Sequence, residues 1–429
     1  MDRRAFLALS GGAGSLTLGL AACADPRSPG RAGADEFPTD PDEIAALYAD
    51  NIYTRLLGVR PHLPAHEHVS RLGGGRMAPE VIAAMAEAND FFVDMHELGR
   101  TAGERIADLM GAEAALVTSG GFSAMVLGAA GCLTGTDSDR VHALPRPTWD
   151  RTECLIQTPH RFDYDRAYRD AGMTIVEAAE RGAFESAISE RTAMIAGLAA
   201  AERQTLFAPP APTHWAPPPD STVMTNRELI EIGGRRGVPV LVDMASDLPT
   251  GVGLREYLEA GADLVVISGG KGLRGPQSSG ILAGRADLIE AARLNASPND
   301  GIGRGMKVGK EEIIGLIVAL ERYVALDTDE WVAGWTEMAR SIASELSDVA
   351  GLRAEVVENT AGYLDVELTW DTDVIPLTSD QAKEGLLVGD PRLAYLMTIR
   401  TRCLREGEDV LVARRLRDFF SAAARGAGG

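Results

Sequence analysis

The feature that most constrains the fold is a repeated alternation of short apolar runs with segments of helical spacing. Two of these runs, residues 238–243 and 264–268, are bounded by glycines and acidic residues, which is typical of buried strands. Strands that alternate with helices form a parallel sheet covered by helices on both faces. The sequence therefore predicts an α/β protein and argues against an all-β sandwich or a repeat array.

Other segments extend this pattern along the chain. Further short apolar runs are strand candidates at residues 114–118, 154–157, 174–177 and 194–198. Helical spacing is expected within residues 41–57, twice within 79–110, and over 311–325. Clustered prolines between residues 209 and 219 exclude regular structure there and favour an exposed loop or lid.

A chain of 429 residues is long enough for two or three domains. We expect a signal and tether over residues 1–36 and an N-terminal helical segment over 37–70. A large domain, with a mostly parallel sheet between helices, is predicted for residues 71–310. The remaining residues, 311–429, mix strand and helix patterns and predict a smaller α+β C-terminal domain.

The first residues resemble an export signal. Arg3 and Arg4 precede a short apolar stretch, which is typical of a twin-arginine signal, and residues 20–23 resemble a bacterial lipobox that ends in Cys23. We expect lipidation of Cys23 and a periplasmic or cell-envelope lipoprotein that contacts the membrane through that lipid alone. The alternative is a mobile N-terminal helix whose two arginines are coincidental.

A lysine lies among glycines directly after the second buried run. Ser268-Gly269-Gly270-Lys271 places this amine at a strand end, where desolvation lowers a lysine pKa and frees it for Schiff-base chemistry. Taken alone, a surface lysine in a glycine-rich turn explains the motif as well. The rest of the chain decides between these two interpretations.

Three further features point to pyridoxal 5′-phosphate (PLP) as the partner of Lys271. Asp243 ends the preceding buried run, where an aspartate keeps the pyridinium nitrogen protonated. Ser119-Gly120-Gly121 joins a strand to a helix, so its N–H groups and the helix dipole favour a phosphate. His160 follows another strand at the usual position of a residue stacked on the ring. The ordered set predicts a PLP site.

Several segments resemble the selenocysteine-synthase-like family of fold-type I PLP-dependent transferases. These segments are residues 71–81, 92–95, 268–271 with 275–277, and 303–311. The family includes L-seryl-tRNA(Sec) selenium transferase and D-glucosaminate-6-phosphate ammonia-lyase. The resemblance implies that Lys271 carries PLP, that Asp243 contacts the ring nitrogen, and that Ser119, Gly120, Gly121 and Ser268 hold the phosphate.

The resemblance also implies a homodimer or a higher homo-oligomer with sites at subunit interfaces. Arg304 and Lys307, in the last matching segment, are candidates to serve a neighbour's substrate, and Arg71 is a candidate in the first. Independently, Arg402 offers a guanidinium fork to a substrate carboxylate, as do Arg400 and Arg405. Taken singly, each of these three arginines fits a surface role better.

Two departures from the family concern the substrate. The family commonly carries an asparagine-containing stretch before the Arg-Leu-Gly-Gly segment, and this chain has residues 66–70, His-Glu-His-Val-Ser, in that place. The proline-rich insertion is the second departure. His66 and His68 alternate as metal ligands sometimes do, but the sequence offers them no partner set of recognisable spacing, so we expect no metal.

Net charge helps to choose among the reactions of this scaffold. With 42 Lys+Arg and 62 Asp+Glu, the chain carries a formal charge of −20, so we expect no nucleic-acid partner. We predict a PLP-dependent lyase of the α,β-elimination or ammonia-lyase type, acting on an amino acid or amino-sugar acid. The alternatives are a selenium transferase, an aminotransferase or racemase, and a lipid-anchored binding protein without catalysis.

Overall fold

The computed structural model describes residues 37–202, 222–246, 253–359, 363–394 and 398–426. The chain divides into Met1–Pro38 and Thr39–Gly429, and the second unit carries the fold. The predicted signal with Arg3, Arg4 and Cys23, and the proline-rich insertion, lie outside the described residues.

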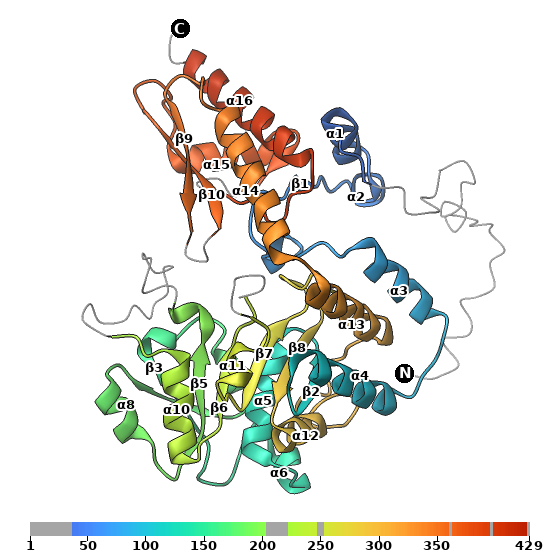
Figure 1. Cartoon of the computed structure of the whole chain (residues 1–429), viewed down its shortest axis with the longest axis vertical. Coiled ribbons are helices and arrows are strands. Elements are labelled where there is room, and N and C mark those ends of the chain that lie inside the picture. The colour runs from blue at the N-terminus through green and yellow to red at the C-terminus, as the bar shows by residue number, and fades with distance from the viewer. Residues whose placement is uncertain (1–36, 203–221, 247–252, 360–362, 395–397, 427–429) are drawn as a thin grey trace, which may run out of the picture. The chain divides into compact units, whose positions relative to one another are not determined.

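A seven-stranded sheet forms the core of the larger part of the second unit (Figure 1), in the order β2-β8-β7-β6-β5-β3-β4. Its strands are β2 (Ala114–Thr118), β3 (Glu153–Gln157), β4 (Thr174–Ala178), β5 (Thr192–Leu198), β6 (Val240–Asp243), β7 (Leu264–Ser268) and β8 (Gly280–Gly284). Strands β3 to β7 pair in parallel, and β8 runs antiparallel to both β2 and β7. The prediction of a mostly parallel sheet between helices is confirmed, and β8 is the strand that the sequence pattern did not reveal.

Helices cover both faces of this sheet. One face packs against α5 (Gly121–Thr134), α7 (Arg166–Asp170) and α12 (Ala286–Asn295). The other packs against α4 (Met95–Met110), α8 (Arg181–Ala187), α10 (Asn226–Arg236), α11 (Glu256–Glu259) and α13 (Lys310–Ala325). Two shorter elements, α6 (Ser138–Ala143) and η3 (Thr158–His160), complete this part.

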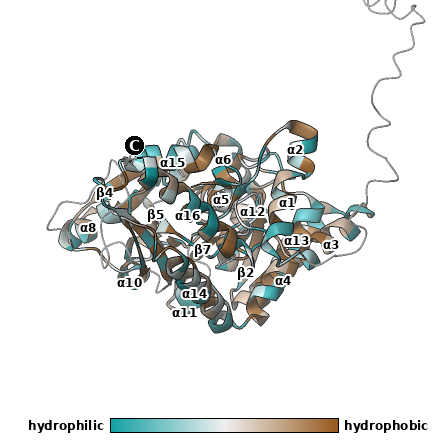
Figure 2. Cartoon of the chain, turned by 90° about the horizontal axis from the view of Figure 1, so that it is seen from above, coloured by the Kyte–Doolittle hydropathy of each residue, from teal (hydrophilic) through white to brown (hydrophobic). Residues whose placement is uncertain are grey.

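Alternating side chains explain why the sheet needs two layers of helices. In β7, Leu264 and Val266 belong to one apolar cluster, whereas Val265 and Ile267 belong to the other. A strand buried on both faces reads as a continuous apolar run, because neither face meets water. Helix α4 is amphipathic instead and carries both hydrophobic and hydrophilic residues (Figure 2).

The C-terminal residues form a smaller sheet with its own helices. Three antiparallel strands, in the order β12-β10-β9, are accompanied by helices; their bounds are β9 (Leu352–Glu358), β10 (Leu364–Trp370), β12 (Thr398–Ile399), α14 (Thr328–Glu345), α15 (Ser379–Val388) and α16 (Glu408–Gly426). The predicted boundary at residue 310 falls at the beginning of α13, whose Ile313, Leu316 and Leu320 pack into the core of the large sheet.

The N-terminal segment of the second unit links the two sheets. It contains α1 (Pro41–Ala49), α2 (Ile52–Leu57), β1 (His62–Leu63), η2 (Ser70–Leu72) and α3 (Pro79–Asn89). Strand β1 pairs in parallel with β11 (Arg392–Leu393), and the Arg400 N–H donates to the Ala65 carbonyl at 3.2 Å. We call residues 62–76, with Asp365 and residues 400–408, the polar junction.

Buried ion pairs hold the polar junction together. Arg402 Nη1 donates to Asp365 Oδ1 at 2.8 Å, and its Nη2 donates to Glu67. At the other end, Arg76 forms two hydrogen bonds to the fully buried carboxylate of Glu408, at 2.7 and 3.0 Å. Ion pairs in the junction therefore join segments that lie more than 300 residues apart in the sequence.

Candidate active site

The predicted cofactor residues lie at one edge of the large sheet. Parallel strands end at the same edge, so the last residues of β5, β6 and β7, which are Leu198, Asp243 and Ser268, lie on adjacent strands. Ligands of open α/β sheets bind beyond these carboxyl ends. The Ser119-Gly120-Gly121 turn follows β2 at the same edge, because Thr118 and Ser268 both pair with Gly280.

Lys271 lies in a turn whose backbone is fixed from two sides. The Gly75 N–H donates to the Gly270 carbonyl at 2.7 Å, and the Arg274 N–H donates to the Lys271 carbonyl at 2.9 Å. A Cβ on Gly75 would come within 2.9 Å of the Lys271 oxygen, so a side chain there is excluded. The lysine backbone is therefore held between the N-terminal segment and its own turn.

Asp243, the last residue of β6, is a buried carboxylate, 5% exposed. Its Oδ1 accepts the Ala245 N–H at 2.8 Å, which orients the carboxyl group. In the sheet, Asp243 pairs with Leu198 on one side and Val266 on the other. This position places an acid beside the strand that leads to Lys271.

The glycine turn begins α5 with no side-chain cap among the described residues. Gly120 has φ +88°, a conformation that favours glycine, and Gly121 allows a close approach. A Cβ on Gly121 would lie 3.0 Å from the Ala245 Cβ and 3.8 Å from the Ser268 Cβ. The N–H groups of the first helical turn thus lie next to Ser268. An anion bound there is stabilised by hydrogen bonds from these N–H groups and by the helix dipole.

His160 is also brought to this edge, and its ring nitrogens are both engaged. Nδ1 accepts the Leu198 N–H at 2.9 Å, so Nε2 carries the proton and donates to the Met224 carbonyl at 2.7 Å. Burial lowers the pKa of His160 to about 4, which keeps the imidazole neutral. Only the ring faces are left for a cofactor, so stacking stays a prediction.

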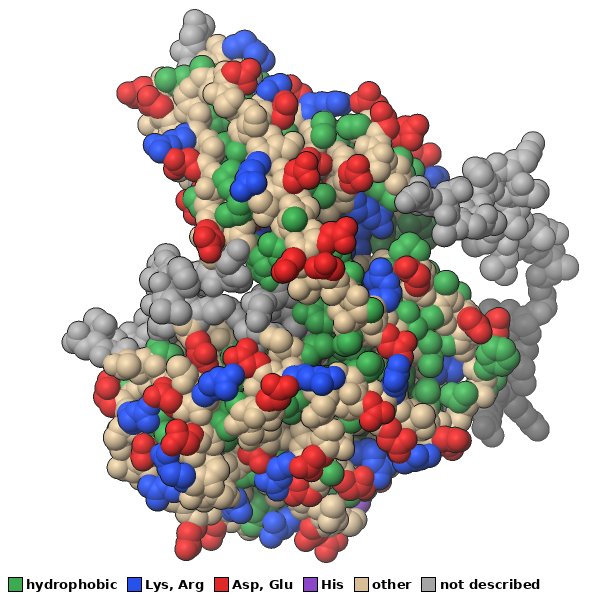
Figure 3. Space-filling view, in the orientation of Figure 1, with side chains coloured by type: hydrophobic (Ala, Val, Ile, Leu, Met, Phe, Trp, Pro, Cys, Tyr) green, Lys and Arg blue, Asp and Glu red, His purple; other side chains and the backbone are tan. Residues whose placement is uncertain are grey.

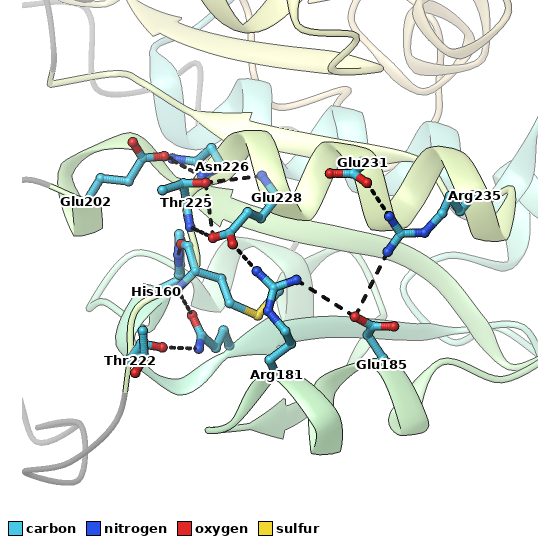
Figure 4. Close-up of polar contacts among 12 residues, drawn as sticks. His160, Arg181, Glu185, Glu202, Thr222, Thr225, Asn226, Glu228, Glu231 and Arg235 are labelled. Atoms are coloured by element: carbon cyan, nitrogen blue, oxygen red, sulfur yellow. Dashed lines mark hydrogen bonds and ion pairs between the residues drawn. The ribbon is translucent and has the colours of Figure 1, made fainter.

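A network of hydrogen bonds and ion pairs holds the segment that begins α10 next to His160 (Figure 4). Gln157 donates to the Thr222 carbonyl at 2.9 Å and accepts the Met224 N–H at 2.8 Å. Thr225 and Glu228 form a capping box at the beginning of α10, and Arg181 pairs with Glu228. This network fixes Met224, and through its carbonyl it fixes the imidazole.

The structure places Arg402, a predicted substrate residue, in the polar junction, where it pairs with internal acids. Both arms of its guanidinium are paired with the internal carboxylates of Glu67 and Asp365, and the group stacks over Tyr363 at 5.3 Å. Both outer nitrogens of the guanidinium are thus already engaged by internal acids. Burial, opposed by these two acids, leaves the pKa of Arg402 above its ordinary value.

The remaining substrate candidates lie in different places. Arg71 is exposed in η2, beside Ser70, whose hydroxyl accepts from Gln277 of the lysine loop at 3.3 Å. Arg304 and Lys307 line a cavity of about 340 Å³ with residues of α4 and α12. The lining of that cavity includes neither Lys271 nor Asp243. Within one chain, the structure therefore does not bring these two cations to the lysine turn.

The residues at the sheet edge fit a PLP group. These residues supply an amine at Lys271 and a buried carboxylate at Asp243. They also supply the uncapped N-terminus of α5, where Gly121 has no side chain and lets a ligand approach the backbone closely. These match the aldehyde, ring nitrogen and phosphate of the cofactor respectively. Within the described ranges, no group of three or more His, Cys, Asp or Glu side chains could hold a metal ion.

Comparisons with known proteins agree with this site. Residues 220–371 match the family model of L-seryl-tRNA selenium transferase (SelA). A Streptomyces 5′-C-glycyluridine monooxygenase-decarboxylase is 32% identical over 385 residues, which covers 85% of this chain and 91% of that protein. The chain belongs to the selenocysteine-synthase-like family. It is a PLP-dependent enzyme of fold type I.

Another member of the family extends the similarity to a solved structure. The D-glucosaminate-6-phosphate ammonia lyase of Salmonella typhimurium is 28% identical, over 87% of this chain and 99% of that protein. A solved D-glucosaminate-6-phosphate ammonia-lyase superposes with a TM-score of 0.74 at 27% identity, covering 87% of this chain and 99% of the other. The predicted family, cofactor and fold class are thus confirmed.

Sequence reasoning missed Glu67, Asp365 and Arg274 as residues of this region. Segment 66–70 departs from the asparagine-containing stretch of the family and so marked this region as different. The partner of Glu67, however, lies 335 residues away in the sequence. Arg274 stood inside a recognised motif and attracted no separate interpretation. A charged residue within a glycine-rich turn was the available signal.

Proposed function

We propose that this enzyme is a lyase that removes a β-substituent and then the amino group from an amino acid or amino-sugar acid. The observation that carries the proposal is the convergence of Lys271, Asp243 and the Gly120–Gly121 turn at one sheet edge. The 28% identity to an ammonia lyase over nearly its whole length supports the reaction type.

Each residue has a distinct task in this reaction. Bound PLP supplies an electron sink for negative charge at the substrate α-carbon. Lys271 Nζ would hold the cofactor covalently through its amine and, when free, would take the proton from the substrate α-carbon. Asp243 would accept a hydrogen bond from the protonated ring nitrogen. Ser268 and the first turn of α5 bind the phosphate.

The test uses the purified protein and its cofactor spectrum. The wild-type protein with PLP is expected to show an internal Schiff-base absorbance band, which Lys271→Ala removes. Candidate β-hydroxy amino acids and amino-sugar acids should release ammonia and a keto acid, and Lys271→Ala should lower the rate at least about 1000-fold, since nucleophile and base are both lost. A spectrum unchanged by Lys271→Ala would sink the PLP assignment.

A second candidate is an oxidative decarboxylation. The observation that favours it is the 32% identity to a monooxygenase-decarboxylase, which exceeds the identity to the ammonia lyase. Oxygen consumption and carbon dioxide release separate the two reactions. Ammonia with a keto acid and no oxygen uptake supports the lyase. Oxygen uptake with loss of the carboxyl carbon replaces it with the second candidate.

Transfer, transamination and racemisation use the same scaffold and are distinguished by product. The charge of −20 disfavours an aminoacyl-tRNA substrate, so we propose a small molecule and no nucleic acid. Amino-group exchange with a keto acid would indicate an aminotransferase. Hydrogen exchange at the α-carbon without net consumption would indicate a racemase.

We also propose that the protein is exported and anchored through a lipid on Cys23. Arg3-Arg4 and the residues before Cys23 support this proposal. In the part of the chain that the structure describes, no helix is both long and apolar enough to span a membrane. Cell fractionation tests the two signals separately. Cys23→Ser removes the lipid attachment site, and the double variant Arg3→Lys with Arg4→Lys removes the twin-arginine signal. Unchanged distribution in both variants would contradict export and anchoring.

A homo-oligomer is proposed from the exposed apolar side chains between α3 and α4. Phe92 is 99% exposed, and Phe91 and Ile82 are 61% and 48% exposed. Hydrophobic side chains gather over α3 and α4, while acidic and basic side chains alternate elsewhere on this face (Figure 3). Large exposed apolar patches mark interaction sites. Light scattering should give a dimer or larger, and Phe92→Glu should dissociate it; a monomeric wild type would contradict this.

A further inference from the structure

Two arginines lie at opposite ends of one aromatic row near the lysine turn. The row consists of Trp331, Trp335 and Tyr363, whose neighbouring ring centroids are 5.7 and 5.6 Å apart. The Arg274 guanidinium lies 4.3 Å from the Trp331 ring, and that of Arg402 lies 5.3 Å from the Tyr363 ring. The two groups thus have similar aromatic support.

Their electrostatic partners differ. Arg402 is matched by the carboxylates of Glu67 and Asp365. Arg274 has no carboxylate oxygen within 4.0 Å among the residues that the structure describes, and its one hydrogen bond there from the guanidinium goes to the Arg402 carbonyl at 3.0 Å. Burial lowers the pKa of Arg274, and the charges of Arg76 and Arg322 add to this effect. A guanidinium in this setting has remaining donors for an anion.

The backbone ties Arg274 to the reacting lysine. Its N–H donates to the Lys271 carbonyl at 2.9 Å. Arg274 has φ +55°, and of the described residues it is the one non-glycine residue with a positive φ. A long side chain in this conformation is strained, and such strain persists where the surroundings hold it, most often at functional sites. Glycine would relieve the strain and would also remove the guanidinium.

We infer that Arg274 binds the carboxylate of the amino-acid substrate, in the role that the sequence had suggested for Arg402. The inference rests on the proposed function, since it concerns the substrate of that site. The carboxylate would accept hydrogen bonds from the guanidinium N–H groups that the Arg402 carbonyl leaves unused, three residues beyond Lys271. Trp331 supports the guanidinium face, so the fork is held before the substrate arrives.

The experiment compares an amino acid with its amide, which lacks the carboxylate charge. DL-Serine and DL-serinamide are titrated into the PLP-loaded protein, and the change in cofactor absorbance gives a Kd for each. Loss of a charge-assisted pair should weaken serine binding about 10- to 100-fold in Arg274→Gly and leave serinamide binding nearly unchanged. Arg274→Lys, which keeps the charge without the fork, should lie between the two.

Stability separates recognition from structural damage. Arg274→Gly is expected to keep or raise Tm, because glycine adopts φ +55° without strain. The matched control, Arg402→Gln, should lower Tm and weaken serine and serinamide by the same factor. An unchanged ratio of the two Kd values in Arg274→Gly would overturn the inference alone. A wild-type protein that responds to neither compound would overturn the inference, whereas the proposed function is tested separately by ammonia release from the candidate substrates.

Discussion

The central sheet and the polar junction are held together by opposite kinds of interaction. Two apolar clusters enclose the sheet, and every side chain of β6 and β8 is buried. The junction instead buries Arg402 with Asp365 and Glu67, and Arg76 with Glu408. The sheet fixes Asp243 and His160, whereas the junction reaches the Lys271 turn through Gly75. The site is therefore assembled from one apolar and one ionic half.

The two halves should respond differently to substitution. An apolar core tolerates swaps that conserve volume, because no single partner is specific. A buried charge has one matched partner, and removing either member leaves the other uncompensated in a poorly solvated place. Asp365 and Arg402 have side chains 1% and 4% exposed, so this argument applies to them fully.

The strongest test breaks the junction at its centre. Arg402→Gln should lower the free energy of unfolding by about 3–5 kcal/mol, because Asp365 and Glu67 lose their buried cation and keep the more distant Arg400, at 3.5 and 3.8 Å. Denaturant unfolding measures this change. The control is Arg285→Gln, whose partially exposed pairs with Asp263 and Asp287 should be worth about 1 kcal/mol or less. Equal losses in both variants would remove the distinction between the halves.

The same difference explains what could be predicted from the sequence. Apolar periodicity is local, so strands such as β2 and β7 were predicted with their observed bounds. Strand β8 begins and ends in glycine and runs antiparallel to β7. Neither its glycine ends nor its direction can be predicted from a local sequence pattern. Lys271 and Asp243 were found because short motifs carry them. The use of both nitrogens of His160 by distant backbone groups could not be foreseen.

Ion pairs across long sequence distances were equally beyond prediction. Glu67 and Arg402 are each ordinary charged residues in their local context, and only the fold brings them together across 335 positions. The guanidinium fork of Arg402 was visible in the sequence, but its internal partners were not. For that reason the sequence favours Arg402 for the carboxylate role, whereas the structure pairs Arg402 with two acids and places none within 4.0 Å of the Arg274 guanidinium among the described residues.

Acid should loosen the junction before the sheet. The junction contains His62 and His68, whose pKa values burial lowers to about 4, and the sheet edge contains His160, also with a pKa of about 4. Unfolded histidine titrates near 6.5, so the unfolded chain binds more protons between pH 4 and 6.5. Stability is then complete above about pH 6.5 and falls on acidification, by about 2 kcal/mol at pH 5 for a fully buried histidine.

Hydrogen exchange at pH 7.5 and pH 5.0 measures this order. Backbone protection of residues 62–76 should fall more than that of β5 and β6, because more histidines titrate in the junction. His68→Asn should reduce the loss in the junction and leave the sheet unchanged. A parallel decrease in both regions would mean that acid acts on the protein as a whole.

The smallest expected effect comes from the contact where the two halves meet. A Cβ on Gly75 would lie 2.9 Å from the Lys271 oxygen and 3.0 Å from the Gly270 oxygen, both of which belong to the backbone. Gly75→Ala should cost about 1–3 kcal/mol of stability and shift the lysine turn, which also lowers the rate. Gly99→Ala in α4 is the matched control, since a Cβ there meets no described atom within 4 Å. Helix propensity predicts a gain of about 0.5–1 kcal/mol for it. If thermal unfolding and the rate change alike in both variants, the junction does not position the lysine.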